Sequence, residues 1–150
     1  MMPEIFVTDD PHRSVQEVIL PGLVAFNQAQ RLSDWRPLGV LARGAEGAVL
    51  GGLAGSTAWG WLYIQYFWLP DGLRRCGLGS AILARAEEEA RARGCHAVWL
   101  DTFSFQAPGF YLRRGYALFG ALEDYPPGHR RFFLQKQLGE GAVRPPRSPA

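Results

Sequence analysis

The sequence predicts a mixed α/β (α+β) fold built around a single sheet, and three observations support this fold class. Segments with strand patterning outnumber those with helical patterning. Most of the expected strands follow one another directly along the chain, which favours antiparallel pairing. One strong helix joins two strands in the middle of the chain, as a parallel crossover does. A chain of 150 residues suits one domain, which we expect over residues 1–138.

Composition narrows the class of protein. Apolar residues make up 47% of the chain and charged residues 20%, which is typical of a soluble globular protein. A net charge of +2 predicts no nucleic-acid partner, and the longest apolar runs are too short for a membrane span. No signal peptide is visible at the start. Two cysteines, Cys76 and Cys95, are too few for a disulfide framework, so we expect a reducing, cytoplasmic location.

The first thirty residues predict a short strand followed by helix. Glu4–Val7 has strand-like composition. Thr8 and the two aspartates before Pro11 form a helix-start signal, with the proline in the first turn. A helical pattern continues to Phe26 and is interrupted by Pro21-Gly22, which predicts two short helices or one kinked helix.

Six strands and two helices are expected after this region. The strands are runs bounded by turn residues, at Leu38–Arg43, Ala48–Trp59, Trp61–Leu69, Ala97–Thr102, Tyr116–Leu122 and Arg131–Leu138. The strongest helix is Ser80–Arg93, whose apolar face comprises Ile82, Leu83, Ala86 and Ala90. A shorter helix, Ala107–Arg114, ends at Gly115. Gly139–Ala150 is rich in proline and glycine, cannot form a core, and is expected to be a disordered tail.

A loop rich in glycine and arginine precedes the strongest helix, in the stretch LPDGLRRCGLGSAILARAEEEARARG. The first amides of a helix have no internal partner and carry partial positive charge. Gly77 and Gly79 let a phosphate approach the backbone closely, and Arg74 and Arg75 can donate charge-assisted hydrogen bonds to its oxygens. The loop therefore predicts a site for a phosphorylated group.

Two common phosphate loops are excluded. A Walker loop needs lysine and then serine or threonine after its last glycine, but Leu78 follows Gly77. A dinucleotide fingerprint needs a third glycine where Ile82 stands.

The segment Arg74-Arg75-Cys76-Gly77-Leu78-Gly79 instead resembles the coenzyme A pyrophosphate loop of the GNAT N-acetyltransferase superfamily. The later stretch QAPGFYLRRGYALFG is similar to that family's second signature. The two stretches come in the family's order and separation and cover roughly Ile64 to Phe119. The resemblance implies a central mixed, mostly antiparallel sheet of about six to seven strands, flanked by about four helices, with a splayed central strand pair for coenzyme A. It also implies a homodimer.

The resemblance implies acetyl-CoA as co-substrate, without a metal. The pantetheine arm would hydrogen-bond the exposed backbone of a splayed strand, at Phe67, Trp68 and Leu69. The pyrophosphate would lie on the loop and helix start, at Arg74, Arg75, Cys76, Gly77, Leu78, Gly79 and Ser80. Direct transfer needs no covalent intermediate, so Cys76 is expected to contribute backbone contacts rather than to act as a nucleophile.

Tyr111 matches the tyrosine that commonly protonates the departing thiolate in this family. A free tyrosine has a pKa of about 10, so its hydroxyl remains a donor at neutral pH. The other reading of Tyr111 is a buried ring that packs its helix against the sheet. The family often has asparagine seven residues earlier, where this chain has Ser104, a shorter side chain that can still hydrogen-bond pantetheine.

The general base is left open by the sequence. Many family members carry a glutamate or aspartate on the central strand, but Trp61–Leu69 contains neither. The remaining candidates are a chain of waters, His129, Glu123 or Asp124, or an amine that arrives already neutral.

We therefore expect an N-acetyltransferase that moves an acetyl group from acetyl-CoA directly to a primary amine. The acceptor could be a small metabolite, an antibiotic, a polyamine or a protein terminus. The alternative is a non-catalytic acyl-CoA-binding sensor or interaction module; the missing strand carboxylate favours that alternative, and Tyr111 favours the enzyme.

Overall fold

The computed structural model describes residues 1–139 and divides into two compact units, Met1–Ser33 and a second unit that begins at Asp34. Apart from Gly139, the predicted tail lies outside the described residues. Among the helices of residues 1–139, none is both long and apolar enough to cross a membrane.

The first unit is helical. Its elements follow one another without a break, as α1 (His12–Ser14), the π-helical turn η1 (Val15–Ile19) and α2 (Leu20–Gln30). The helix begins directly after the predicted start signal, but Pro11 is its N-cap and does not lie in the first turn as expected. The Pro11 carbonyl accepts a hydrogen bond of 2.9 Å from the Val15 amide. Pro21 lies in the first turn of α2, directly after the π turn η1, so the interruption predicted at Pro21-Gly22 takes the form of a π turn in a continuous helical segment.

The expected strand at Glu4–Val7 is wrong. These residues pair with no strand among residues 1–139, and the side chains of Ile5, Phe6 and Val7 are largely exposed. Strand composition alone does not make a strand, because the backbone groups of an isolated segment gain no ladder partner.

The second unit contains a single six-stranded sheet. Its strands are β1 (Arg36–Arg43), β2 (Val49–Ala58), β3 (Trp61–Trp68), β4 (Ala97–Phe103), β5 (Ala117–Glu123) and β6 (Arg130–Gln137). They lie in the order β1-β2-β3-β4-β6-β5, and every neighbouring pair is antiparallel except β3 and β4. The expected mixed, mostly antiparallel sheet is therefore confirmed. The parallel pair is joined by the crossover helix α3 (Leu78–Ala92).

The two parallel strands form a fork. They pair only from Trp61 opposite Ala97 to Ile64 opposite Leu100. Beyond that point β3 stays paired with β2 as far as Trp68, and β4 stays paired with β6 as far as Phe103. A bulge between β2 and β3 leaves one extra residue on β3 directly after Ile64, and bulges bend the strand that carries them. The expected splayed strand pair is thus present at the middle of the sheet.

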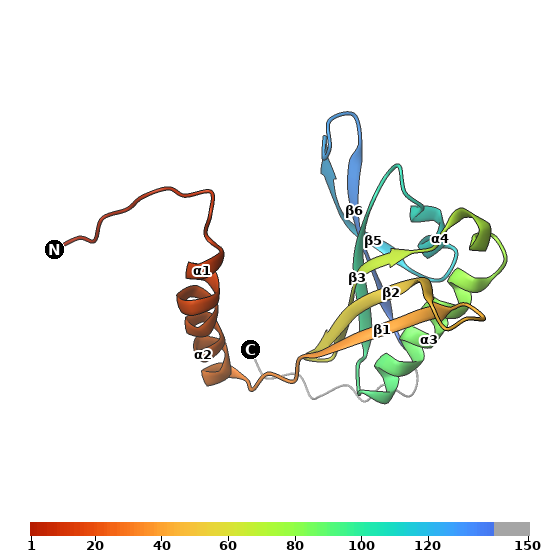
Figure 1. The fold of residues 1–150 in the computed structure, drawn as a ribbon, viewed down its shortest axis with the longest axis horizontal. Helices are drawn as coiled ribbons and strands as arrows, with labels where there is room; N and C mark the ends of the chain where they lie inside the picture. The colour runs from red at the N-terminus through yellow and green to blue at the C-terminus, as the bar shows by residue number, and fades with distance from the viewer. Residues whose placement is uncertain (140–150) are drawn as a thin grey trace. The chain divides into compact units, whose positions relative to one another are not determined.

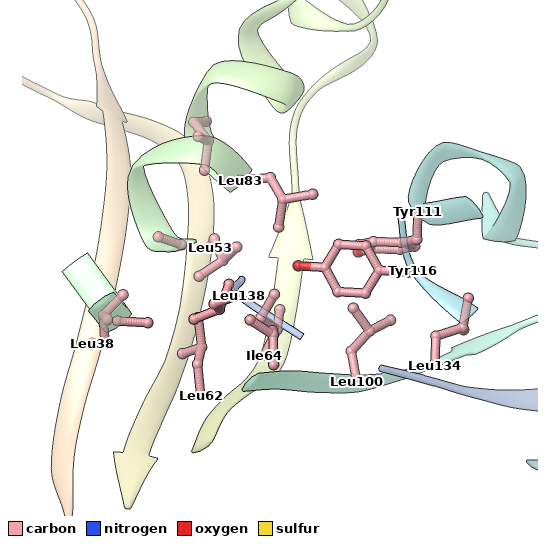
Figure 2. Packing of buried hydrophobic residues seen from close by; sticks show 14 of the residues in the cluster. Leu38, Leu53, Leu62, Ile64, Leu83, Leu100, Tyr111, Tyr116, Leu134 and Leu138 are labelled. Carbon is pink, nitrogen blue, oxygen red and sulfur yellow. The ribbon is translucent and has the colours of Figure 1, made fainter. Parts of the chain in front are cut away.

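The main core lies between the sheet and α3, which packs across β1, β2 and β3 (Figure 1). The predicted apolar face of α3 is buried, as Ile82, Leu83, Ala86 and Ala90. Figure 2 shows Leu53, Leu62, Ile64 and Leu100 of the strands meeting Leu83 of the helix. Two short helices follow the two strands of the fork along the chain: the 3-10 turn η2 (Asp71–Leu73) comes after β3, and α4 (Pro108–Leu112) comes after β4.

Candidate active site

Arg74 stabilises the loop between β3 and α3 through contacts with Leu69 and Asp71. Its Nε donates to the carbonyl oxygen of Leu69 over 2.7 Å, and its Nη1 lies 2.7 Å from a carboxylate oxygen of Asp71. Arginine carries five N–H donors, so some remain for a ligand. The guanidinium that the sequence assigns to phosphate binding therefore also holds the loop to the end of β3.

The backbone of the loop turns sharply before the helix begins. Arg75 and Gly77 both have left-handed dihedrals, with φ of 61° and 85°. Gly77 is the N-cap of α3, and the first bond inside the helix is from the Ala81 amide to the Gly77 carbonyl, at 3.0 Å. The amides of the three residues between them lie in the part of a helix that lacks internal acceptors. Successive amides in such a turn, together with the helix dipole, favour an anion.

The two glycines of the loop serve different purposes. Gly77 needs its left-handed dihedral, and a Cβ atom there would point into open space. At Gly79 a Cβ would lie 3.6 Å from the Phe110 ring and 3.7 Å from a methyl group of Leu69, which are ordinary contacts. Gly79 thus faces Phe110 of α4, whereas Gly77 faces open space.

Cys76 is exposed on this loop, and its thiol donates to the Leu73 carbonyl at 3.1 Å. The hydrogen-bond partner of this thiol is thus a backbone carbonyl and not a histidine or other base. Cys95 is buried, and burial raises the pKa of its thiol.

Arg114, which the sequence analysis overlooked, lies against the start of α3. Its Nε donates to the Ser80 hydroxyl at 3.0 Å, and its Nη1 donates to the Phe110 carbonyl at 2.8 Å. The guanidinium stacks 3.8 Å above the centre of the Phe110 ring. Arg114 therefore brings a third positive charge to the loop and links it to α4. In the sequence, the feature that could have indicated this role is the pair Arg113-Arg114 directly before Gly115.

The predicted pantetheine strand is the part of β3 inside the fork. Phe67 packs edge-on against Phe110, with ring centres 5.9 Å apart, and Trp68 is 58% exposed. Leu69 is buried just beyond the strand. Since the pairing with β4 ends at Ile64, the backbone of these residues faces the fork without a strand partner on that side among residues 1–139.

Tyr111 lies on α4, and its side chain is buried. Its ring packs edge-on against Phe110 and Tyr116, with centres 5.1 Å and 5.7 Å away. Figure 2 shows Tyr111 beside Tyr116. Burial raises the pKa of Tyr111 to about 12. The hydroxyl therefore stays protonated at neutral pH and can donate a hydrogen bond.

Ser104 follows β4 and extends its pairing with β6. Its amide donates to the Arg130 carbonyl at 2.8 Å, and its hydroxyl oxygen accepts from the Arg130 amide at 3.0 Å. Because that oxygen already accepts a backbone bond, the hydroxyl hydrogen is the part of Ser104 best suited to meet a ligand.

The three candidate bases from the sequence lie around the turn between β5 and β6. Glu123 forms an exposed ion pair with Arg130 at 2.8 Å. The Asp124 carboxylate accepts a long bond of 3.4 Å from the Gly128 amide within the same turn. His129 packs its ring edge-on against Phe105, with centres 5.0 Å apart.

A fourth carboxylate, Asp101 of β4, is not among the bases that the sequence predicts. It is the only charged residue of β4, AVWLDTF, and it pairs with Arg131 at 2.7 Å. A lone charge in an otherwise apolar strand was the available signal. Among residues 1–139 no group of three or more histidine, cysteine, aspartate or glutamate side chains could hold a metal ion.

Comparison with known proteins identifies the family to which the chain belongs. The sequence pattern of the "Acetyltransferase (GNAT) family" matches residues 7–116. The chain is 46% identical to the blasticidin-S acetyltransferase of Streptomyces morookaense, over 84% of this chain and 95% of that protein. It is 37% identical to acetyltransferase Atu2258 of Agrobacterium fabrum, over 88% of this chain and 97% of that protein.

A solved structure agrees with these relatives. The crystal structure of a putative acetyltransferase from Agrobacterium tumefaciens superposes with a TM-score of 0.80 at 36% identity, covering 91% of this chain and 99% of that one. Both the acetyltransferase relatives and the fold support the enzyme over the binding module that the sequence left as an alternative. The protein is an acetyl-CoA-dependent acyltransferase and belongs to the GNAT family of acetyltransferases.

Proposed function

We propose that the protein acetylates a primary amine by direct transfer, with the donor held in the fork between β3 and β4. The observation that carries this proposal is the position of the fork. Strand β3 separates from β4 after Ile64 and ends at Trp68, and a single loop then leads to the amide-lined start of α3 at Leu78. A long thioester can therefore lie along Phe67–Leu69 while its pyrophosphate meets the amides that follow Gly77.

The positive groups around the loop suit a pyrophosphate. Arg74 and Arg75 belong to the loop itself, Arg114 reaches the helix start from the turn after α4, and the amides of Leu78, Gly79 and Ser80 lie at that helix start. The backbone of Cys76 completes the turn, and Ser104 offers its hydroxyl hydrogen to the pantetheine arm.

Tyr111 acts as the general acid in this proposal. The neutral amine nitrogen attacks the thioester carbonyl carbon, and the carbon–sulfur bond then breaks. The sulfur takes one proton from the Tyr111 hydroxyl, which is later restored by the proton that the amine nitrogen has lost. A buried hydroxyl that stays protonated supports this role, because a thiolate leaves more readily when a donor quenches its charge.

Blasticidin S is the first acceptor to test, because the relative at 46% identity is named for it. The experiment mixes the protein with acetyl-CoA and blasticidin S, follows thiol release and weighs the product by mass spectrometry. We expect one acetyl group per product molecule and a matching quantity of free thiol. Thiol release without an acetylated product would contradict this acceptor.

Three further properties belong to the proposal. The family match spans residues from both units, which supports one working domain over residues 1–138. Free Cys76 and Cys95 support a reducing, cytoplasmic location. A homodimer is proposed from the family resemblance, and light scattering of the purified protein tests it.

A further inference from the structure

The face of the sheet opposite α3 carries a cluster of aromatic and charged side chains. Along β4 the residues Val98, Leu100 and Thr102 are buried toward the core, so the alternate residues lie on the other face. This second face bears Tyr63, Trp99, Asp101, Phe103, Arg131 and Phe133. Tyr63 and Trp99 stack with ring centres 4.2 Å apart, directly across the parallel pair.

Asp101 occupies the branch point of the fork. Leu100 is the last residue of β4 that pairs with β3, so Asp101 is the first residue beyond the branch. Its side chain is only 14% exposed. Asp101 is therefore the carboxylate of this face that the fold places at the fork itself, whereas Glu123 and Asp124 lie at the turn between β5 and β6.

Arg131 holds Asp101 from one side. Its Nε and Nη2 lie 2.8 Å and 2.7 Å from the same carboxylate oxygen, Oδ2. The guanidinium is itself enclosed by rings at 5.1 to 5.6 Å, those of Phe103, Tyr125 and Phe133. Within residues 1–139 both bonds to the carboxylate end on Oδ2, so Oδ1 keeps its lone pairs for another donor.

The surroundings of Oδ1 suit a cation. The stacked Tyr63 and Trp99 rings lie on the same face, one pleat before Asp101, and aromatic rings attract an ammonium group. Burial and, after it, the Asp101 charge raise the pKa of Tyr63, and the Arg131 charge opposes this. Because Arg131 holds Oδ2 of Asp101, Oδ1 points in a fixed direction. An amine bound to Oδ1 is then held in a defined position for its attack on the thioester.

Resting on the proposed function, we propose that Asp101, clamped by Arg131, receives the cationic amine of the acceptor at Oδ1 and accepts its proton. The substrate class is a primary amine that arrives as an ammonium ion. The amine gives one proton to Asp101, attacks the thioester carbonyl carbon as the neutral form, and loses a second proton as the amide forms. One of the two protons ends on the coenzyme A sulfur through Tyr111, and the other passes to solvent.

The test compares three variants whose predictions differ. Asp101→Asn removes the carboxylate charge and leaves the clamp. Arg131→Gln removes the clamp and leaves the carboxylate. Glu89→Gln breaks an ion pair of 3.0 Å with Arg93 on the opposite face of the sheet and serves as the matched control. Acetyl-CoA affinity is measured by calorimetry, and kcat/KM is measured with blasticidin S, spermidine and tyramine.

We expect Asp101→Asn to bind acetyl-CoA within about threefold of wild type and to lose about 10²-fold or more in kcat/KM, the usual cost of a lost proton acceptor. The loss in kcat/KM for Arg131→Gln should be at least tenfold smaller than the loss for Asp101→Asn, because the carboxylate remains. Glu89→Gln should stay within twofold in both measurements.

Equal losses of kcat/KM in Asp101→Asn and Arg131→Gln would overturn the inference. An ion pair that only stabilises the fold is broken to the same extent whichever partner is replaced. Loss of less than about threefold in Asp101→Asn would also overturn it. If Asp101→Asn fails to fold, the double variant Asp101→Asn/Arg131→Gln, which leaves no unpaired charge, takes its place with the same expected loss. A wild-type protein that binds acetyl-CoA but acetylates none of the three amines overturns the proposed function, and the inference with it.

Discussion

The Nζ atom of Lys136 lies 2.6 Å from the Oε1 atom of Glu87, whose side chain is 8% exposed. The hydroxyl of Tyr116 donates to the other oxygen, Oε2, at 3.2 Å. Burial and the Glu87 carboxylate both raise the pKa of Tyr116. This network joins α3 to β6, and through the Tyr116 ring it reaches Tyr111.

Replacing Glu87 with Gln should destabilise the fold. Breaking a buried ion pair from one side leaves a charge without its partner, and because Lys136 can still reach water we expect a loss of about 2–3 kcal/mol in the free energy of unfolding. Urea denaturation followed by circular dichroism measures it. Glu88→Gln, which breaks an exposed pair with Arg85 on the same helix, should cost less than about 0.5 kcal/mol. Equal midpoints for the two variants would mean that the Glu87 network adds little.

Replacing Tyr111 with Phe should separate catalysis from binding. The ring and its packing remain, so stability should change by about 1 kcal/mol or less. If the hydroxyl is the general acid, kcat should fall by about 10²–10⁴ while acetyl-CoA affinity is unchanged. Steady-state kinetics with an accepted amine and calorimetry provide the two numbers. A variant that keeps more than about a third of the wild-type kcat would remove Tyr111 from the mechanism.

The stability of the fold at alkaline pH should also depend on Tyr111. In the unfolded chain this hydroxyl loses its proton near pH 10, whereas in the folded protein it keeps it to about 12. Its contribution is therefore complete below pH 10 and is lost as the pH rises through 12. Between pH 8 and 11 the wild type should lose about 1.4 kcal/mol more than Tyr111→Phe. Urea titrations of both proteins at each pH test this, and identical declines would contradict the raised pKa.

Local patterning was enough to predict most of the second unit. The apolar spacing of α3 gave its buried face correctly, since a helix shows one stripe to the sheet whatever its neighbours are. The fold class followed from the number and succession of the strands and from the one helical crossover between them. The prediction of a strand at Glu4–Val7 was wrong, because strand formation depends on a partner strand that is distant in sequence.

The parts of the candidate site that the sequence did not predict depend on contacts between secondary-structure elements. Asp101 and Arg131 are neighbours only because β4 and β6 pair in a register that sets Asp101 opposite Phe133. A shift of one residue would have turned Asp101 toward the core. Arg114 likewise reaches Ser80 from the turn after α4, more than thirty positions away, so its place beside the loop before α3 depends on tertiary packing.

The most direct test of the account is acetyl-CoA binding by the loop before α3. Gly77→Asp and Gly77→Asn add side chains of nearly the same shape at a position where a Cβ meets open space, and both residues tolerate a left-handed backbone. Only the aspartate places a negative charge where the pyrophosphate is expected. Calorimetry should show that Gly77→Asp binds acetyl-CoA at least tenfold more weakly than Gly77→Asn, since a hydrogen bond to a charged group contributes about 1.5–3 kcal/mol. Affinities within threefold of each other, in two folded variants, would contradict the assignment of this loop to the pyrophosphate.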